Sequence, residues 1–211
     1  MKISENQLRK IIREEILAER LSLSEKITAV HFGDKSSGDT TGEDSSGASG
    51  NGKIIIFGDS QTGGEIGRFL SLAYSGRILG EIQTMNGSGV SYWIGEGWMR
   101  VQSIIEEEGC PEAFLILLGS NPDGASNPKS LVDKILSACS NAKIHWSGGP
   151  PSTEDTDGIL KRNKEISKAI SSVATFYDPL DSMTAEQVGN TPYPSRDLAS
   201  KYVEEQLEGI V

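Results

Sequence analysis

The sequence places a serine where a nucleophile could work. Four apolar residues, Ile54 to Phe57, form a run typical of a strand buried on both faces, and Gly-Asp-Ser60 follows directly. From Glu65 onward the apolar residues recur with helical spacing. A serine between a strand and a helix has an exposed hydroxyl and an unpaired backbone N–H, which suits attack on a carbonyl group. Taken alone, the same serine predicts an ordinary helix cap.

Three further loops follow the next apolar runs. Gly89 lies in a glycine-rich loop at 85–93, and Asn121 comes three residues after the apolar run 114–118. The stretch 147–151 reads Ser-Gly-Gly-Pro-Pro. Parallel strands end at a common edge of their sheet, where α/β proteins bind ligands. We therefore expect these loops to meet beside Ser60.

Strand-like and helix-like patterns alternate from residue 53 to the end of the chain. This alternation predicts an α/β domain, a three-layer sandwich around a five-stranded parallel sheet of flavodoxin-like order. The predicted strands are Lys53–Gly58, Ile78–Gln83, Ala113–Gly119, Lys143–Ser147 and Ala174–Tyr177. The predicted helices are Gly64–Ser75, Trp93–Glu108, Pro128–Cys139, Ile159–Ser172 and Ser195–Glu208.

The part of the chain before residue 53 divides into two segments. Residues 1–32 contain an amphipathic helix, over 1–26, with an apolar stripe that includes Leu8 and Ile12. Residues 33–52 hold no large apolar side chain and predict a flexible Gly/Ser/Asp linker. We expect the first segment to dock on another protein and residues 53–211 to form the folded domain.

The charge and composition exclude several classes of partner. Lys and Arg number 20 against 30 Asp and Glu, for a formal net charge of −10. An acidic surface repels nucleic acid and anionic membranes, so neither partner is expected. The sequence shows no apolar core of a signal peptide and no stretch long enough to span a bilayer.

The two cysteines, Cys110 and Cys139, are expected at the starts of successive strands. A bridge between them can form from that placement, but buried free thiols in a reducing cytoplasm are the expectation.

The four loops, in this order and on this type of sheet, resemble the SGNH (GDSL-like) hydrolases. The resemblance covers Lys53 to about Leu207. It implies that Ser60 attacks an ester carbonyl and forms an acyl-enzyme. It also implies an oxyanion hole made by the N–H groups of Ser60 and Gly89 and the side-chain amide of Asn121. Asp59 is then expected to support the loop. No cofactor and no metal are expected.

The last motif of that family is absent. The family carries Asp-x-x-His after the fifth strand, but here the corresponding positions hold Gly189 and Pro192, neither of which accepts a proton. The chain has two histidines: His31 precedes the linker, and His145 alternates with apolar residues inside a predicted strand. Three loop carboxylates remain as substitute bases, although solvation is their ordinary role: Asp123, Asp155 and Asp157.

The N-terminal segment carries two resemblances of its own. Residues 1–16 resemble N-terminal segments found on many proteins of marine tailed phages, and Leu17-Ala18-Glu19 looks like a prohead-protease cleavage site. The resemblances imply a phage capsid or tail protein as the docking partner. They also imply assembly in the cytoplasm of an infected bacterium and then a place in the virion.

Two functions remain open on the sequence alone. The first is a serine esterase acting on carbohydrate or cell-envelope esters, weakly or with a non-standard base. The second is an inactive virion module of the same fold that binds glycan or serves structure. Four aromatic residues fit either a sugar-binding platform or, more often, a core: Tyr92, Trp93, Trp98 and Trp146.

Overall fold

The five predicted strands form one parallel sheet in the order β2-β1-β3-β4-β5. In the computed structural model, residues 52–190 and 193–210 are described. The expectations for residues 1–51 and for Pro192 lie outside the described residues. The predicted fold class and strand order are confirmed for the described part of the chain.

The sheet strands are β1 (Ile54–Gly58), β2 (Gln83–Thr84), β3 (Ala113–Leu117), β4 (Lys143–Ser147) and β5 (Thr175–Tyr177). The α-helices are α2 (Ser60–Gly63), α3 (Glu65–Ala73), α4 (Val90–Ile94), α5 (Trp98–Glu108), α6 (Pro128–Ala138), α7 (Thr156–Ile170), α8 (Ala185–Val188) and α9 (Arg196–Tyr202). Two 3₁₀ helices are η1 (Pro122–Ala125) and η2 (Pro179–Asp181), and a π-helix, η3 (Val203–Leu207), follows α9.

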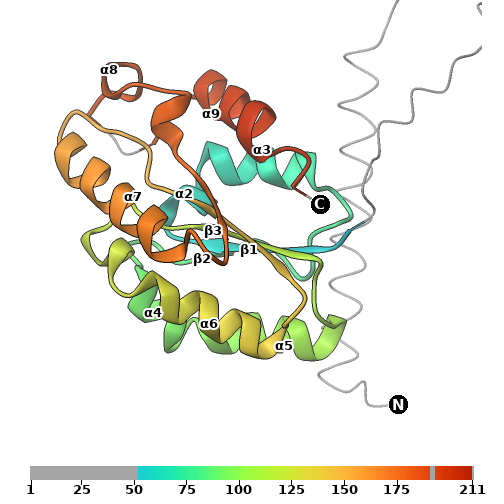
Figure 1. Ribbon diagram of the computed structural model, residues 1–211. Coiled ribbons are helices and arrows are strands. Elements are labelled where there is room, and N and C mark those ends of the chain that lie inside the picture. The colour runs from blue at the N-terminus through green and yellow to red at the C-terminus, as the bar shows by residue number, and fades with distance from the viewer. Residues whose placement is uncertain (1–51, 191–192, 211) are drawn as a thin grey trace, which may run out of the picture. The chain divides into compact units, whose positions relative to one another are not determined.

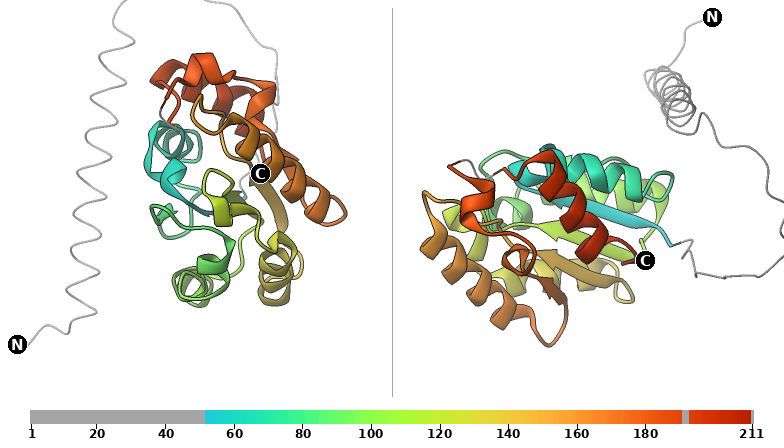
Figure 2. Two further views of the ribbon diagram at one scale, coloured as in Figure 1. Left: turned by 90° about the vertical axis from the view of Figure 1, so that its left-hand side faces the viewer. Right: turned by 90° about the horizontal axis from the view of Figure 1, so that it is seen from above.

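Helices cover both faces of the sheet. Successive side chains of a strand point to opposite faces, so β1 contributes Ile55 and Phe57 to one core and Ile54 and Ile56 to the other. The first core contains side chains of α4, α5, α6 and α7, and the second contains those of α3 and α9. Figure 1 shows α4, α5 and α6 on one side of the sheet and α3 and α9 on the other. The helices α3 and α9 lie side by side over their face (Figure 2).

The second strand is shorter than predicted. The sequence indicates a strand over Ile78–Gln83, but pairing with β1 is limited to Gln83 and Thr84 and to an isolated bridge between Ile54 and Ile78. Gly80 lies between these two contacts with a φ of +62°, a conformation that interrupts an extended strand.

One predicted helix has an extra helical turn before it, and another is divided in two. The predicted helix Gly64–Ser75 is α3, with the one-turn helix α2 before it. The predicted helix Trp93–Glu108 consists of α4 and α5, separated by Gly95-Glu96-Gly97. Glycine loses the most conformational freedom in a helix, so these glycines favour the break.

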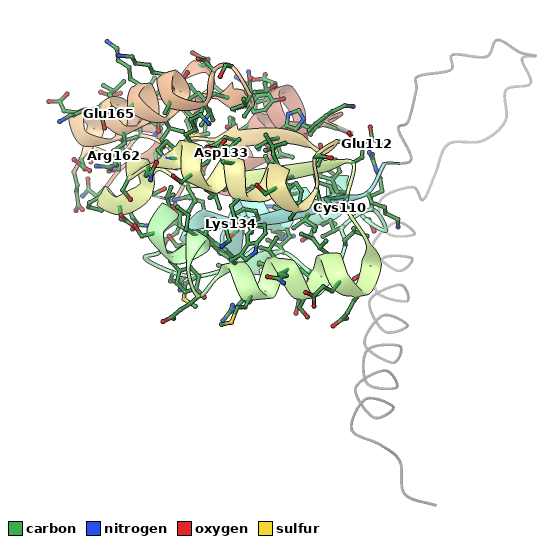
Figure 3. All side chains as sticks on the ribbon, turned by 60° about the horizontal axis from the view of Figure 1, so that its bottom comes forward. Cys110, Glu112, Asp133, Lys134, Arg162 and Glu165 are labelled. Carbon is green, nitrogen blue, oxygen red and sulfur yellow. A yellow bond between two sulfur atoms is a disulfide. The ribbon has the colours of Figure 1, made fainter. Side chains whose placement is uncertain are left out.

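The expectation of two free thiols is wrong. Cys110 and Cys139 form a disulfide with their Cα atoms 5.6 Å apart. Ala113 of β3 is in register with Lys143 of β4, and this pairing brings together the segments that precede the two strands. The bond therefore joins the entry to β3 to the end of α6. Figure 3 shows Cys110 far from Arg162, near the opposite end of the domain.

Among the residues that the structure describes, no helix is both long and apolar enough to cross a membrane.

Candidate active site

Ser60 is the first residue of α2, directly after the fully buried end of β1. Its neighbour Asp59 caps this helix, because one carboxylate oxygen accepts a hydrogen bond of 2.9 Å from the N–H of Gln61. Ser60 itself is half-buried. Since α2 is only four residues long, charge at Ser60 would be stabilised by individual N–H groups rather than by a long helix dipole.

Asn121 links three of the predicted loops. Its side-chain Nδ2 donates to Oδ2 of Asp59 at 3.3 Å and to the carbonyl oxygen of Ser88 at 3.0 Å. Asp59 is adjacent to Ser60, and Ser88 is adjacent to Gly89. The structure therefore brings together the loops that carry Ser60, Gly89 and Asn121, the residues that the family resemblance assigns to the nucleophile and oxyanion hole.

Those two contacts also occupy the Asn121 amide. The NH₂ group carries two hydrogens, and both have an acceptor within the protein. Asn121 can bind an oxyanion only by giving up or sharing one of these two hydrogen bonds. The bond to Asp59 is the longer and therefore the weaker of the two.

Gly89 is required by the close packing of its loop against η1. A Cβ at this position would lie 2.5 Å from the carbonyl carbon of Asp123 and 2.6 Å from its Cβ. The carboxylate of Asp123 in turn accepts hydrogen bonds from the N–H and hydroxyl of Ser91, in the first turn of α4. Asp123 thus anchors the Gly89 loop to the Asn121 loop, a structural role that the sequence pattern did not indicate.

Asp59 is the most perturbed carboxylate of the site. Burial raises its pKa to about 6, and hydrogen bonds from Gln61 and from the Gly119–Ser120 segment offset part of that rise. The side chain has no exposed surface. Both carboxylate oxygens of Asp59 therefore accept hydrogen bonds from the protein. This position is consistent with the expected role of Asp59 in supporting the loop around Ser60.

Two neighbouring residues of α7, Arg162 and Asn163, form hydrogen bonds with the backbone of the loops after β3 and β4. Arg162 donates from Nε to the carbonyl oxygen of Gly119 at 2.9 Å and from a terminal nitrogen to that of Ser120 at 3.1 Å (Figure 3 shows its place). Asn163 is fully buried and pairs with both the N–H and the carbonyl of Gly149.

The sequence analysis did not predict these contacts of Arg162 and Asn163, although one feature of the sequence indicates a role for Asn163. Asn163 falls on the same face of its helix as Ile159, Ile166 and Ile170, where an apolar residue is expected. A buried amide on an apolar face needs hydrogen-bond partners, and here the partners are the loop backbones.

The loop after α8, where the family resemblance implies the last motif, is tied to the segment after β4 and lies beside α2. Before the undescribed pair 191–192, Gly189 accepts a hydrogen bond of 3.0 Å from the N–H of Thr153, and Asn190 accepts one of 2.7 Å from the Thr153 hydroxyl. After that pair, the ring of Tyr193 lies beside Gly64, at the end of α2.

Gly189, the residue at the position where the family resemblance implies an aspartate, adopts a backbone conformation that favours glycine. Its φ of +82° and ψ of −155° lie in a region that is essentially restricted to glycine. An aspartate in this conformation would be strained, so the family's acid does not suit this backbone.

Two of the described candidates for a substitute base, His145 and Asp155, have partners elsewhere. His145 lies inside the sheet as expected, buried on the face opposite Ile144 and Trp146, with Nδ1 2.9 Å from the Tyr177 hydroxyl. Burial and the charge of Lys143 lower its pKa. Asp155 pairs with Arg162 at 2.7 Å. Asp157 is not a loop residue, because it lies in the first turn of α7.

The aromatic residues considered for a sugar platform are mostly core. Trp93 and Trp146 have no exposed surface, Trp98 is 8 % exposed, and Tyr92 packs partly buried against them. An exposed ring near α2 is instead that of Tyr193, which is 44 % exposed and lies beside Gly64.

In the described part of the chain, no group of three or more His, Cys, Asp and Glu side chains is arranged to hold a metal ion.

Comparison with solved structures identifies the fold. The chain superimposes on a carbohydrate esterase of family 3 from Talaromyces cellulolyticus with a TM-score of 0.56 and 12 % identity, covering 74 % of this chain and 94 % of that one. It matches a protein assigned to the SGNH hydrolases from Slackia heliotrinireducens with a TM-score of 0.54 and 14 % identity, over 74 % and 98 % of the two chains. The domain has the SGNH-hydrolase fold.

A member of the lipolytic G-D-S-L family from Veillonella parvula has the same SGNH fold, at a TM-score of 0.50 and 15 % identity, over 74 % of this chain and 98 % of that one. No protein-family model matches the sequence, and no curated protein sequence does. At these identities the likeness is one of fold, and the chemistry must be argued from the residues of this SGNH-fold domain.

Proposed function

We propose that the domain is an SGNH-type serine ester hydrolase of low turnover, directed at acyl esters of carbohydrate or cell-envelope polymers. Oγ of Ser60 attacks the ester carbonyl, and the C–O bond to the alcohol breaks as that alcohol takes up the serine proton. Water then cleaves the acyl-serine and releases the carboxylic acid. The N–H groups of Ser60 and Gly89 and the amide of Asn121 receive the oxyanion.

The observation that carries the proposal is the hydrogen-bonded link from Asp59 through Asn121 to Ser88. This link holds three separate loops at one edge of the sheet with Ser60 at their junction. A serine that only capped a helix would not need the buried carboxylate, the amide and the close glycine packing that surround Ser60.

Low turnover follows from the residues at the acid and base positions. Gly189 and Pro192 cannot take the serine proton, and His145 is buried within the sheet. In a serine hydrolase the loss of the base costs roughly 10⁶ in kcat, while roughly 10³ over water remains from binding and the oxyanion hole. Proton removal from Ser60 then depends on hydroxide or on a base carried by the substrate.

A second function, a glycan-binding module without turnover, is favoured by one specific observation. Both hydrogens of the Asn121 amide are bound within the protein, so an oxyanion must compete for one of them. If it cannot compete, the site binds esters without accelerating their cleavage.

A fluorophosphonate probe separates the two functions, because it reacts with a nucleophilic serine. We expect slow, stoichiometric labelling of the native chain at Ser60 and none in Ser60→Ala. Labelling absent even after long exposure, with saccharide binding intact, would favour the binding module.

For the N-terminal segment we propose docking of residues 1–26 on a capsid or tail protein of a tailed phage, after assembly in the infected cell. The apolar stripe followed by a polar linker supports this proposal. Mass spectrometry of mature particles tests it: cleavage after Glu19 favours prohead processing, and an intact N-terminus that makes no contact contradicts docking.

A further inference from the structure

We propose that Tyr193 is a specificity residue that stacks on a neutral sugar ring of the substrate. This inference deepens the proposed function and rests on it for Ser60 as the reacting group. The sequence offers no indication of such a role, because Tyr193 follows a degenerate motif and is separate from the other aromatic residues.

The first support is the position of the ring. The point where a Cβ on Gly64 would stand is 3.5 Å from Cδ1 of Tyr193 and 3.7 Å from the carbonyl oxygen of Ser60. Both distances are ordinary van der Waals contacts, so the ring of Tyr193 and the turn that begins at Ser60 both border Gly64. A sugar lying on Tyr193 would therefore have its acyl groups near Ser60.

The second support is that the Tyr193 ring is exposed while the backbone on either side of it has contacts with the rest of the domain. Tyr193 is 44 % exposed, whereas Trp93, Trp98 and Trp146 are in the core. Its successor Pro194 is buried, and before the undescribed pair the loop is tied to Thr153 through Gly189 and Asn190. An aromatic surface that is already oriented loses little conformational entropy on binding.

The third support concerns the charge of the ligand. The titratable groups around the site include the buried Asp59, Asp123 with its bonds to Ser91, and the Asp155–Arg162 pair. Directly after Gly64, Glu65 is paired with Arg68 at 3.1 Å. The whole chain has a formal net charge of −10. This field disfavours polymers rich in uronic acid or phosphate and favours an uncharged pyranose, whose C–H groups pack on an aromatic face.

The test measures binding of acetylated xylohexaose by calorimetry in a Ser60→Ala background, which prevents turnover. We expect Tyr193→Ala to weaken binding by about fivefold to tenfold and Tyr193→Phe to retain it, because the ring and not the hydroxyl makes the contact. Met99→Ala is the matched control, since Met99 is 68 % exposed on α5 and should not matter. Equal affinities for Tyr193→Ala and its parent would overturn the inference.

A second measurement guards against a folding defect in the alanine variant. Fluorotyrosine is incorporated, and the Tyr193 signal is assigned by its absence in Tyr193→Phe. That signal should shift as acetylated xylohexaose is added, and a stationary signal at saturating ligand counts against stacking.

The binding measurements on Tyr193 and the labelling of Ser60 can fail independently of each other. Ser60 labelling without any effect of Tyr193 on binding overturns this inference and leaves the hydrolase standing. Binding that depends on Tyr193 in a chain whose Ser60 never labels overturns the hydrolase, while the stacking role remains.

Discussion

The amide of Asn121 donates to the carboxylate of Asp59 across 3.3 Å, and through this contact two separate strand ends become one site. The same nitrogen reaches the carbonyl of Ser88 at 3.0 Å and so brings in the loop that holds Gly89. Asn121 is therefore both a structural link and the expected oxyanion donor, and the two roles compete.

Replacing Asn121 by alanine should affect both roles. The loss of two hydrogen bonds, one to a buried carboxylate, should lower the free energy of unfolding by about 1–3 kcal/mol. Phosphonylation of Ser60 should slow by roughly 10²-fold because an oxyanion donor is lost. Urea unfolding and timed labelling measure the two effects. The control Asn141→Ala removes an exposed turn amide and should change neither. A faster labelling rate in Asn121→Ala would contradict the donor role.

The raised pKa of Asp59 predicts a specific dependence of stability on pH. The folded-state pKa is about 6 and the ordinary value is 3.8, so the folded protein binds more protons than the unfolded chain between these values. Stability from this group is thus greatest below about pH 4 and is lost as the pH rises to about 6. The loss amounts to about 3 kcal/mol.

Asp59→Asn should remove that contribution. Urea unfolding of both proteins at several pH values between 4 and 7 gives the difference between their free energies of unfolding. The contributions of the other titrating groups are common to both proteins and cancel in this difference. We expect the advantage of the native chain over the variant to shrink toward pH 7. Parallel curves would show that Asp59 titrates normally.

Gly89→Ala should disrupt the site through packing. The added Cβ would lie 2.5 Å from the carbonyl carbon of Asp123 and 2.6 Å from its Cβ, which is far inside van der Waals contact. The Gly89 loop or η1 must therefore move. We expect a loss of about 1–3 kcal/mol and a large decrease in Ser60 labelling. Gly64→Ala is the control for stability, because its Cβ meets Tyr193 at an ordinary 3.5 Å. A Gly89→Ala protein as stable as this control would contradict the packing argument.

The disulfide should contribute measurably to stability. Cys110 and Cys139 are separated by 29 residues in sequence. Closing a loop of this size lowers the entropy of the unfolded chain by an amount worth about 3.5 kcal/mol. Reduction should lower Tm by about 10 °C in differential scanning calorimetry. The double variant Cys110→Ser with Cys139→Ala should not respond to reductant, and an equal Tm for oxidised and reduced native protein would contradict the bond's role.

The fold was predictable from the sequence because its buried strands are short and uninterrupted. Ile54–Phe57 and the run that forms β3 are apolar at every position, as strands covered on both faces must be. The strand near Ile78 was predicted too long because apolar content alone does not reveal the turn at Gly80. The disulfide was missed because it depends on the register of β3 and β4, which lies beyond any local pattern.

The candidate site was predictable where loop residues follow strands directly. This rule indicated the loops of Asp59, Ser60, Gly89 and Asn121. In the structure Asn121 bonds to Asp59 and to Ser88, which precede Ser60 and Gly89 in the chain. Arg162 and Tyr193 were not indicated, because their importance depends on tertiary contacts with Gly119 and Gly64. A helix residue and a loop aromatic carry no sequence pattern that specifies such contacts.

The central claim is that Ser60 is a nucleophile in a site that lacks its base, and chemical rescue tests it most directly. The rate of fluorophosphonate labelling at Ser60 is measured from pH 6 to 9.5, with and without added imidazole, in the native chain and in Ser60→Ala. Without a histidine base, we predict slow labelling whose rate rises steadily with pH and increases when imidazole supplies the missing proton acceptor. Fast labelling that levels off near pH 7 and ignores imidazole would contradict the account, as would no labelling of Ser60 under any condition.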